Sequence, residues 1–298
     1  MKKKARHVKP AAFAGYAALI TAASFWGASG VFVKLIAANE LVSATALAFW
    51  RDFATFLCLL LLGLATIPAR LRIERADWRH MAGMGACLGA FHIFYNLSVM
   101  LNGAAVTTVQ QALMPAIVTI VAWYLWQEAF SSRKILAIVL AFAGAVLVAG
   151  PADIKASGFT LHGLLIGFCV PCLYAAWNLF GKRVRMQYDA LVVLIFAFGI
   201  ASAMLLPLQF FIPQPWPIQP TTWLFFAGLI GLSTVSAFFL YAVGIGRLQA
   251  GIASILLMSE IAFAVFYAYL LLNERLVLTQ VAGSILVVIG VLQLVGKN

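Results

Sequence analysis

The chain has 298 residues, of which 64% are hydrophobic and only 10% are charged, and its mean hydropathy is +1.02. A soluble domain is roughly 45–50% apolar and about 25% charged, and its core has no room for such a surplus of apolar side chains. The composition therefore excludes a soluble enzyme, a nucleic-acid-binding protein and a disordered regulator. Lipid is the expected solvent, and the net charge of +11 comes from basic residues in the short gaps between apolar runs.

Ten apolar runs are long enough to cross a bilayer as helices, which need about 20 residues each. Open strands are excluded in lipid because their unpaired backbone groups find no partner there. The sequence therefore predicts an all-α integral membrane protein with ten transmembrane helices, over residues 12–33, 42–67, 79–101, 105–127, 134–150, 160–181, 190–212, 222–244, 250–272 and 277–296. Since no gap can hold a folded soluble domain, the function must reside in the helical bundle.

The distribution of Lys and Arg predicts the orientation of these helices. With a cytoplasmic N-terminus, sixteen of the twenty basic residues fall inside, Arg51 lies within a span, and only Lys34, Lys155 and Arg275 fall outside. Both termini are therefore expected in the cytoplasm of a multi-pass protein of the cell (inner) membrane, with a basic tail over residues 1–11. No small-residue cleavage site closes the first apolar run, so we interpret it as a retained span and not as a signal peptide.

The four cysteines all lie in apolar runs, which argues against a disulfide framework. Cys169 and Cys172 form a C-x-x-C pair, but no other Cys or His stands near them at metal-ligand spacing. We interpret all four as structural thiols and predict neither a metal site nor a cofactor.

The two halves of the chain are similar at an offset of 146 residues, without gaps, from Tyr95–Gly150 to Tyr241–Gly296. Nine positions are identical, and they include the pair Tyr95/Tyr241 and the pair Glu128/Glu274. Because the offset covers five spans, an odd number, the second copy must cross the membrane upside down. We therefore predict a five-plus-five inverted repeat over residues 12–150 and 160–296, an arrangement typical of transporters that alternate access around a midplane site.

Two stretches resemble the drug/metabolite transporter superfamily, in its ten-helix EamA branch. In the first, Pro115 precedes the span-ending Glu128 by thirteen residues and Gly144 lies in the next span. In the second, Glu274, Gln280 and Gly283 fit the pattern, whereas Ile261 stands where the family usually has proline. The aromatic-rich interior resembles that of YddG-like amino-acid exporters. The resemblance implies a central cavity lined by spans 1, 3, 4, 6, 8 and 9, with spans 5 and 10 to the side.

Polar and aromatic side chains on these spans are the candidate substrate-binding residues. In the third span, Gly85, Gly89, His92 and Asn96 follow a spacing of 4, 3 and 4, which places them on one helical face. The full predicted set is Trp26, His92, Tyr95, Asn96, Gln110, Gln111, Met114, Tyr174, Trp177, Asn178, Tyr241, Met258, Ser259 and Glu260. For each, packing or structural hydrogen bonding is the competing interpretation.

Three charged residues lie deep in the apolar runs, where a charge is costly and usually functional. Glu260 lies near the middle of the ninth span with no basic residue close in sequence, so we expect it to bind a substrate ammonium group or to carry a proton. Arg51 and Asp52 are adjacent and point about 100° apart on a helix, so they do not face each other. We interpret them as structural anchors in the outer third of the second span, while a functional role stays open.

These features predict a secondary transporter that exports small metabolites by alternating access. Amino acids, including aromatic ones, are the expected substrates. One alternative is an exporter of hydrophobic organic cations that uses Glu260 and cation–π contacts. The other is an intramembrane enzyme, which would need a catalytic motif that the sequence does not contain, so no enzyme is predicted. The expected partners are a small-molecule substrate and the lipid bilayer, without nucleic acid. Proton coupling is left open, and the protein is expected to be a monomer or a weak dimer.

Overall fold

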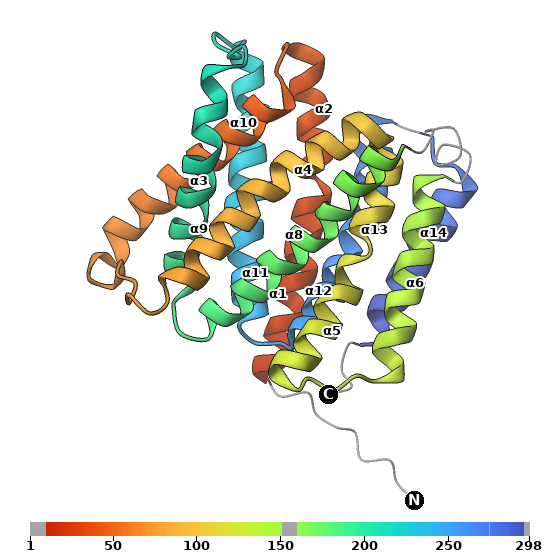
Figure 1. Ribbon diagram of the computed structural model, residues 1–298. Coiled ribbons are helices and arrows are strands. Elements are labelled where there is room, and N and C mark those ends of the chain that lie inside the picture. Colours follow the sequence, from red (N-terminus) through yellow and green to blue (C-terminus); the bar gives the residue numbers. More distant parts are fainter. Residues whose placement is uncertain (1–9, 151–159, 274, 295–298) are drawn as a thin grey trace, which may run out of the picture.

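A computed structural model describes residues 10–150, 160–273 and 275–294 of the chain (Figure 1). Within these residues every regular element is a helix, as the sequence predicts, and there is no strand. Most of the expected N-terminal tail, residues 1–9, lies outside the described residues, as does Glu274.

The helices of the first half follow the predicted apolar runs closely. They are α1 (Pro10–Gly27), α2 (Ser29–Asn39), α3 (Ala44–Thr66), the short η1 (Pro68–Arg70), α4 (Trp78–Gln111), α5 (Met114–Trp126) and α6 (Ser132–Ala149). Ser43 and Ser131 begin α3 and α6 as N-caps, since each side chain accepts a hydrogen bond from the backbone N–H three residues later.

The second half contains more interruptions within its predicted spans. Its helices are α8 (Leu161–Arg185), α9 (Ala190–Leu205), η2 (Leu206–Phe210), α10 (Pro220–Ile230), the π-helix η3 (Gly231–Ser236), α11 (Ala237–Ile245), α12 (Ala250–Leu257), α13 (Ser259–Leu272) and α14 (Leu278–Leu292). The predicted span 222–244 is thus made of α10, η3 and α11, and the span 250–272 is made of α12 and α13.

Eight segments of the described chain are long and apolar enough to cross a membrane, and they correspond to eight of the ten predicted spans. The predicted span 277–296 is present as the shorter apolar helix α14. The predicted span 79–101 forms the first part of α4 but is not among the eight. The structure therefore supports a multi-pass membrane protein, while the number ten stays a prediction.

The long helix α4 does not run straight. The hydroxyl oxygens of Ser98 and Thr107 lie 2.8 Å apart, although residues nine positions apart in a straight helix are separated by about 13.5 Å along the axis. Ser98 also donates to the side-chain oxygen of Gln110 at 3.1 Å. The chain therefore reverses direction between Ser98 and Thr107, where the sequence predicts a gap between two spans.

Contacts at one end of the bundle join segments that the predicted orientation places in the cytoplasm. Lys134, which opens α6, donates to the side chain of Gln249 just before α12 at 2.9 Å. Tyr16 in the first turns of α1 donates to the carbonyl of Leu294 at 3.1 Å, beyond the end of α14. The first and the last described helices therefore start and finish at the same end of the molecule.

Contacts at the opposite end join segments predicted outside. Glu40, after α2, accepts a hydrogen bond from the backbone N–H of Gln219 before α10 at 2.6 Å. Asn102 donates to the carbonyl of Gly163 in α8 at 2.7 Å. Gaps between spans that alternate along the sequence between predicted inside and predicted outside thus lie at opposite ends of the bundle.

Helices α6 and α14 lie side by side at one edge of the bundle (Figure 1). A Cβ atom added at Gly144 would lie 2.6 Å from the carbonyl oxygen of Gly283, and one at Gly283 would lie 2.5 Å from that of Gly144. Only glycine allows this approach, which is how small residues bring membrane helices together. The pair occupies the lateral place that the resemblance implies for spans 5 and 10.

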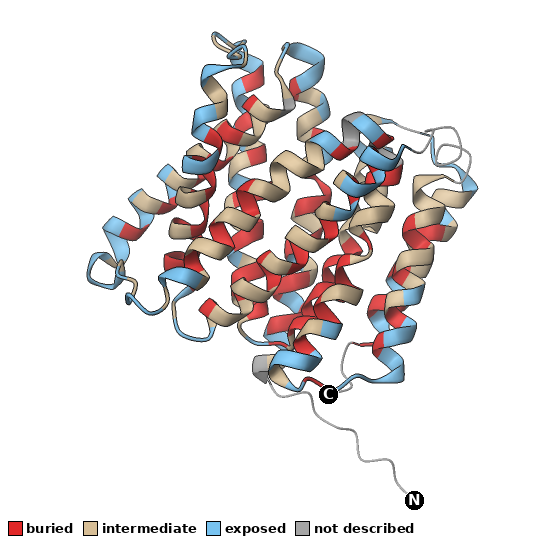
Figure 2. Ribbon diagram, in the orientation of Figure 1, coloured by how far each residue is buried: buried red, intermediate tan, exposed pale blue. Residues whose placement is uncertain are grey.

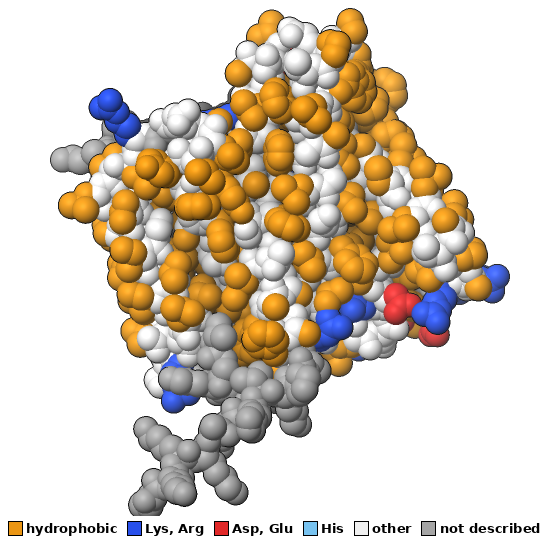
Figure 3. Space-filling model, turned by 180° about the vertical axis from the view of Figure 1, so that it is seen from behind, with side chains coloured by type: hydrophobic (Ala, Val, Ile, Leu, Met, Phe, Trp, Pro, Cys, Tyr) orange, Lys and Arg blue, Asp and Glu red, His pale blue; other side chains and the backbone are white. Residues whose placement is uncertain are grey.

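Buried residues concentrate on the helices at the centre of the bundle, and the outer faces of the peripheral helices are exposed (Figure 2). On the face seen in Figure 3, hydrophobic side chains cover a broad band, and most Lys and Arg side chains lie along its lower rim. An exposed apolar surface of this extent is unfavourable in water and suits a lipid environment.

Candidate functional site

Two helices break at equivalent positions in the two halves. In the first half α4 ends at Gln111 and α5 begins at Met114, and in the second half α12 ends at Leu257 and α13 begins at Ser259. At the offset of 146 residues, Met114 corresponds to Glu260, so the break places the acidic side chain in the first turn of α13. Discontinuous helices with exposed backbone ends are typical of substrate sites in transporters.

An aromatic cluster from three helices lies beside this break. Trp26 of α1, Tyr174 and Trp177 of α8, and Phe238 and Tyr241 of α11 are all buried. Trp177 stacks on Tyr241 with 4.4 Å between ring centroids and on Tyr174 with 5.6 Å. Trp26 contacts the ring of Tyr241 at 5.6 Å and that of Phe238 at 4.9 Å. The cluster brings together four of the predicted site residues in a rigid wall.

Asn178 connects this wall to the first helix break. Its amide oxygen accepts a hydrogen bond from the Tyr241 hydroxyl at 3.2 Å, and its amide nitrogen lies 3.9 Å from the sulfur of Met114. The same nitrogen donates to the carbonyl of Tyr174 at 2.9 Å. Asn178 is completely buried, so it holds the wall in place and is not itself accessible.

Two polar atoms of the wall have no partner. The indole N–H groups of Trp26 and Trp177 are buried and make no hydrogen bond with any described residue. A buried polar group without a partner costs free energy.

Glu260 lies near the wall. Its side chain is half-buried and within electrostatic range of the hydroxyl groups of Tyr95 and Tyr174. Its carboxylate accepts no hydrogen bond from the described residues. Tyr95, which is half-buried, packs through Phe91 against Tyr174, at centroid distances of 5.7 and 5.0 Å. The structure thus brings Glu260, Tyr95 and the aromatic wall into one neighbourhood.

The adjacent residues Arg51 and Asp52 of α3 bind different neighbours. The Arg51 side chain donates from Nε to the hydroxyl of Thr234 at 2.8 Å and from Nη2 to the carbonyl of Ser233 at 3.4 Å, both in η3. Asp52 has no exposed area and lies 2.8 Å from Nδ1 of His92 on α4. His92 therefore has a carboxylate partner on α3, and Arg51 is bound to η3.

Other predicted site residues have local partners. Gln110 interacts with Ser98 and lies against Gly167 of α8, in van der Waals contact with the backbone. Ser259 is buried and donates to the carbonyl of Leu256 at 2.7 Å. Met258 is buried at the break, while Asn96 and Gln111 are half-buried. None of these contacts tests a role in substrate binding, which stays a prediction for the whole set.

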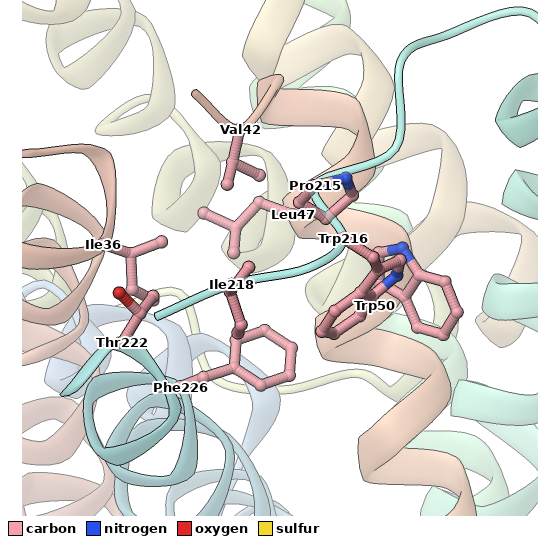
Figure 4. A pocket seen from close by; sticks show the side chains of 9 residues that line it. All are labelled: Ile36, Val42, Leu47, Trp50, Pro215, Trp216, Ile218, Thr222 and Phe226. Atoms are coloured by element: carbon pink, nitrogen blue, oxygen red, sulfur yellow. The ribbon is translucent and has the colours of Figure 1, made fainter. Parts of the chain in front are cut away.

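An apolar pocket at the outer end of the bundle is separate from this site (Figure 4). Side chains from α2, α3, α10, the connection between α2 and α3 and the segment before α10 line it: Ile36, Val42, Leu47, Trp50, Pro215, Trp216, Ile218, Thr222 and Phe226. Its lining carries no charge. The pocket therefore offers no group for recognising a polar substrate, and we place the candidate site at the helix break.

The sequence interpretation did not predict the hydrogen-bond partners of Arg51. A guanidinium inside a span needs an acceptor or a counter-charge, but no acidic residue other than Asp52 lies near it in sequence. The packing of α3 against η3 supplies the acceptors Thr234 and Ser233, and neither residue carries a signal in the sequence. A functional role for Arg51 stays open.

The fold and this site define a multi-pass membrane transporter. The chain belongs to the EamA-like transporter family of the drug/metabolite transporter superfamily, whose profile matches residues 13–150 and 161–296. It is similar to two uncharacterised transporters of Archaeoglobus fulgidus, with 23% identity over 92% of this chain and 96% of the relative, and 26% identity over 93% and 95%. The uncharacterised transporter YwfM of Bacillus subtilis is 25% identical over 92% and 91%. One crystal structure shares the fold with a TM-score of 0.78 over 96% of each chain, at 20% identity.

Proposed function

We propose that the protein is a secondary transporter that exports amino acids, including aromatic ones, through a central site at the helix breaks. One observation carries the proposal: the carboxylate of Glu260 accepts no hydrogen bond from the described residues and lies near a wall of aromatic rings. A carboxylate binds an ammonium group, and the rings Trp26, Tyr95 and Tyr174 suit an aromatic or apolar side chain. No motif for catalysis or ATP hydrolysis is present in the sequence, so substrate gradients or exchange drive the transport.

The ten-span inverted repeat, over residues 12–150 and 160–296, is part of the proposal. The two non-glycine residues with left-handed backbone in the described chain are Gln127, with φ of 52°, and Asn273, with φ of 53°. They lie 146 residues apart, at the end of α5 and of α13. Such a conformation is uncommon outside glycine, so its recurrence at the offset of the sequence repeat supports two copies of one unit.

Alternating access is supported by a hydrogen-bonded clamp at the end predicted to be cytoplasmic. Glu128, which follows α5, accepts from the backbone N–H groups of Ala250 and Gly251 at 2.7 and 3.2 Å, at the start of α12. Lys134 lies 3.8 Å from the same carboxylate, and the side chains of both residues are less than 10% exposed. We name these residues the inner clamp. It joins the two halves and closes this end.

A second set of contacts holds the same end. Lys182, at the end of α8, donates to the carbonyls of Ile245 and Leu248 at 3.1 and 2.5 Å, and Arg185 donates to the carbonyl of Ala242 at 2.7 Å. Positive side chains at the C-terminal end of α11 are favourable because the helix dipole is negative there. These contacts hold the inner end closed, which supports a gate at this end of an alternating-access transporter.

The proposal is tested by counterflow in proteoliposomes, with a panel of labelled amino acids, organic cations and sugar phosphates. We expect saturable, trans-stimulated uptake of amino acids that is lost in Glu260→Gln, a change that keeps the shape of the side chain but removes its charge. Glu40→Gln, at the outer rim, is the matched control and is expected to transport normally. Transport of organic cations without amino acids would favour the multidrug alternative. Normal amino-acid transport by folded Glu260→Gln protein would refute the site.

A further inference from the structure

Arg51 and Glu260 form a separated pair of opposite charges at the site. Both side chains are half-buried; Arg51 lies in α3, and Glu260 lies in the first turn of α13. No direct ion pair or hydrogen bond joins them in the part of the chain that the structure describes. Both nevertheless lie around α1, because this helix packs against η3, which binds Arg51, and against α13, which carries Glu260.

Arg51 is held by fewer hydrogen bonds than it can make. A guanidinium has five N–H donors, and two of its nitrogens donate, to Thr234 and Ser233. Its remaining N–H groups have no partner among the described residues. The two bonds to η3 fix the plane of the guanidinium, so its free edge has a defined direction.

Asp52 does not neutralise Arg51 by direct contact. The Asp52 carboxylate lies on another face of α3 and takes His92 as its partner at 2.8 Å. Two opposite charges in a bundle gain most from direct contact or from a bridging group, because each charge is costly there when it is left without a partner. A ligand that carries both charges would supply the missing partner to Arg51 and to Glu260.

We propose that Arg51 and Glu260 together bind the charged ends of a zwitterion, with the guanidinium binding its carboxylate and Glu260 its ammonium group. The inference rests on the proposed function and adds a residue that determines specificity. A guanidinium binds a carboxylate in a planar, bidentate geometry. The same positive charge repels a ligand that carries only an ammonium group, so the site selects amino acids over amines and organic cations.

The experiment compares L-phenylalanine with L-phenylalaninamide, which keeps the ring and the ammonium group but lacks the carboxylate. In counterflow by wild-type proteoliposomes, we expect phenylalanine to be preferred at least tenfold. Arg51→Gln should raise the half-saturating concentration of phenylalanine tenfold or more. The half-saturating concentration of phenylalaninamide should stay the same or fall. Arg51→Lys, which keeps the charge but not the planar fork, should restore part of the loss.

Two further variants test whether the effect of Arg51→Gln comes from the position of the guanidinium or from the loss of any positive charge. Thr234→Val keeps the charge of Arg51 but removes the hydrogen bond at Nε, so it should raise the half-saturating concentration for phenylalanine by a smaller factor. It also tests the inference if Arg51→Gln does not fold. Arg70→Gln, which removes an exposed charge at the rim, should change neither substrate.

The experiment distinguishes a failure of this inference about Arg51 from a failure of the proposed function. If the wild-type protein transports no amino acid, the proposed function is wrong. If it transports phenylalanine and phenylalaninamide equally well, or if Arg51→Gln weakens both substrates by the same factor, amino-acid transport stands and the role of Arg51 in binding the carboxylate is refuted.

Discussion

Removal of the charge of Glu128 should open the inner end of the protein. The Glu128 carboxylate accepts from the N–H groups of Ala250 and Gly251 and lies 3.8 Å from Lys134. In Glu128→Gln only one acceptor oxygen remains, so one N–H group loses its partner. A hydrogen bond to a charged group contributes about 1.5–3 kcal/mol, and an acidic group at a helix N-terminus typically adds about 0.3–1 kcal/mol. We expect the closed inner end to lose about 2–4 kcal/mol in total.

This loss falls on the closed state alone, because separation of the two halves breaks the same contacts. A change of about 2–4 kcal/mol corresponds to a shift of roughly thirtyfold to several hundredfold in the population of the open state. The assay replaces Ser254, which is buried in α12, by Cys in a protein without the four natural cysteines. The labelling rate by a membrane-impermeant maleimide, applied from the cytoplasmic side, should rise at least tenfold in the Glu128→Gln background.

Glu40→Gln provides the control. Glu40 also accepts from a helix start, through the N–H of Gln219 at 2.6 Å and the hydroxyl of Thr222 at 2.9 Å, but at the opposite end of the bundle. It should leave the labelling rate at position 254 unchanged or lower it. Equal rates in Glu128→Gln and wild-type protein would refute the inner clamp as a gate.

Three further outcomes are expected. Trp177→Leu removes the central ring of the buried wall and should lower the free energy of unfolding by about 2–4 kcal/mol, which is measured as a lower Tm in detergent. Trp223 is half exposed at the rim, so Trp223→Leu should leave the Tm unchanged. Gly144→Leu should abolish the folded yield, measured by size-exclusion chromatography, because its Cβ atom meets the Gly283 carbonyl at 2.6 Å. Tyr95→Leu should weaken phenylalanine binding about three- to tenfold with alanine transport intact; equal weakening of both would indicate a packing role.

Part of the candidate site could be predicted from the sequence because intramembrane polar residues are rare and therefore informative. Glu260 was identified by its position in an apolar run, and it lies in the first turn of a helix that starts inside the bundle. The break itself had no local signal, since Ile261 stands where a proline would predict one. The chain nevertheless departs from regular helix at Met258, between Leu257 and Ser259.

The sequence by itself determined the membrane class and most of the helices. Lipid offers no hydrogen-bond partner to the backbone, so an apolar run of sufficient length must be helical whatever its neighbours are. The sequence repeat likewise marked Glu128 as a residue that ends a span, and Glu128 lies one residue beyond Gln127, the C-cap of α5.

Only the tertiary structure decided which residues meet across the bundle. Sequence shows that Arg51 and Asp52 diverge on α3, but not that one binds Thr234 and the other His92. It also does not show that Glu128 binds the start of α12 in the other half. These contacts join residues that are 40 to 183 positions apart, and their geometry depends on how whole helices pack, which local pattern and charge do not encode.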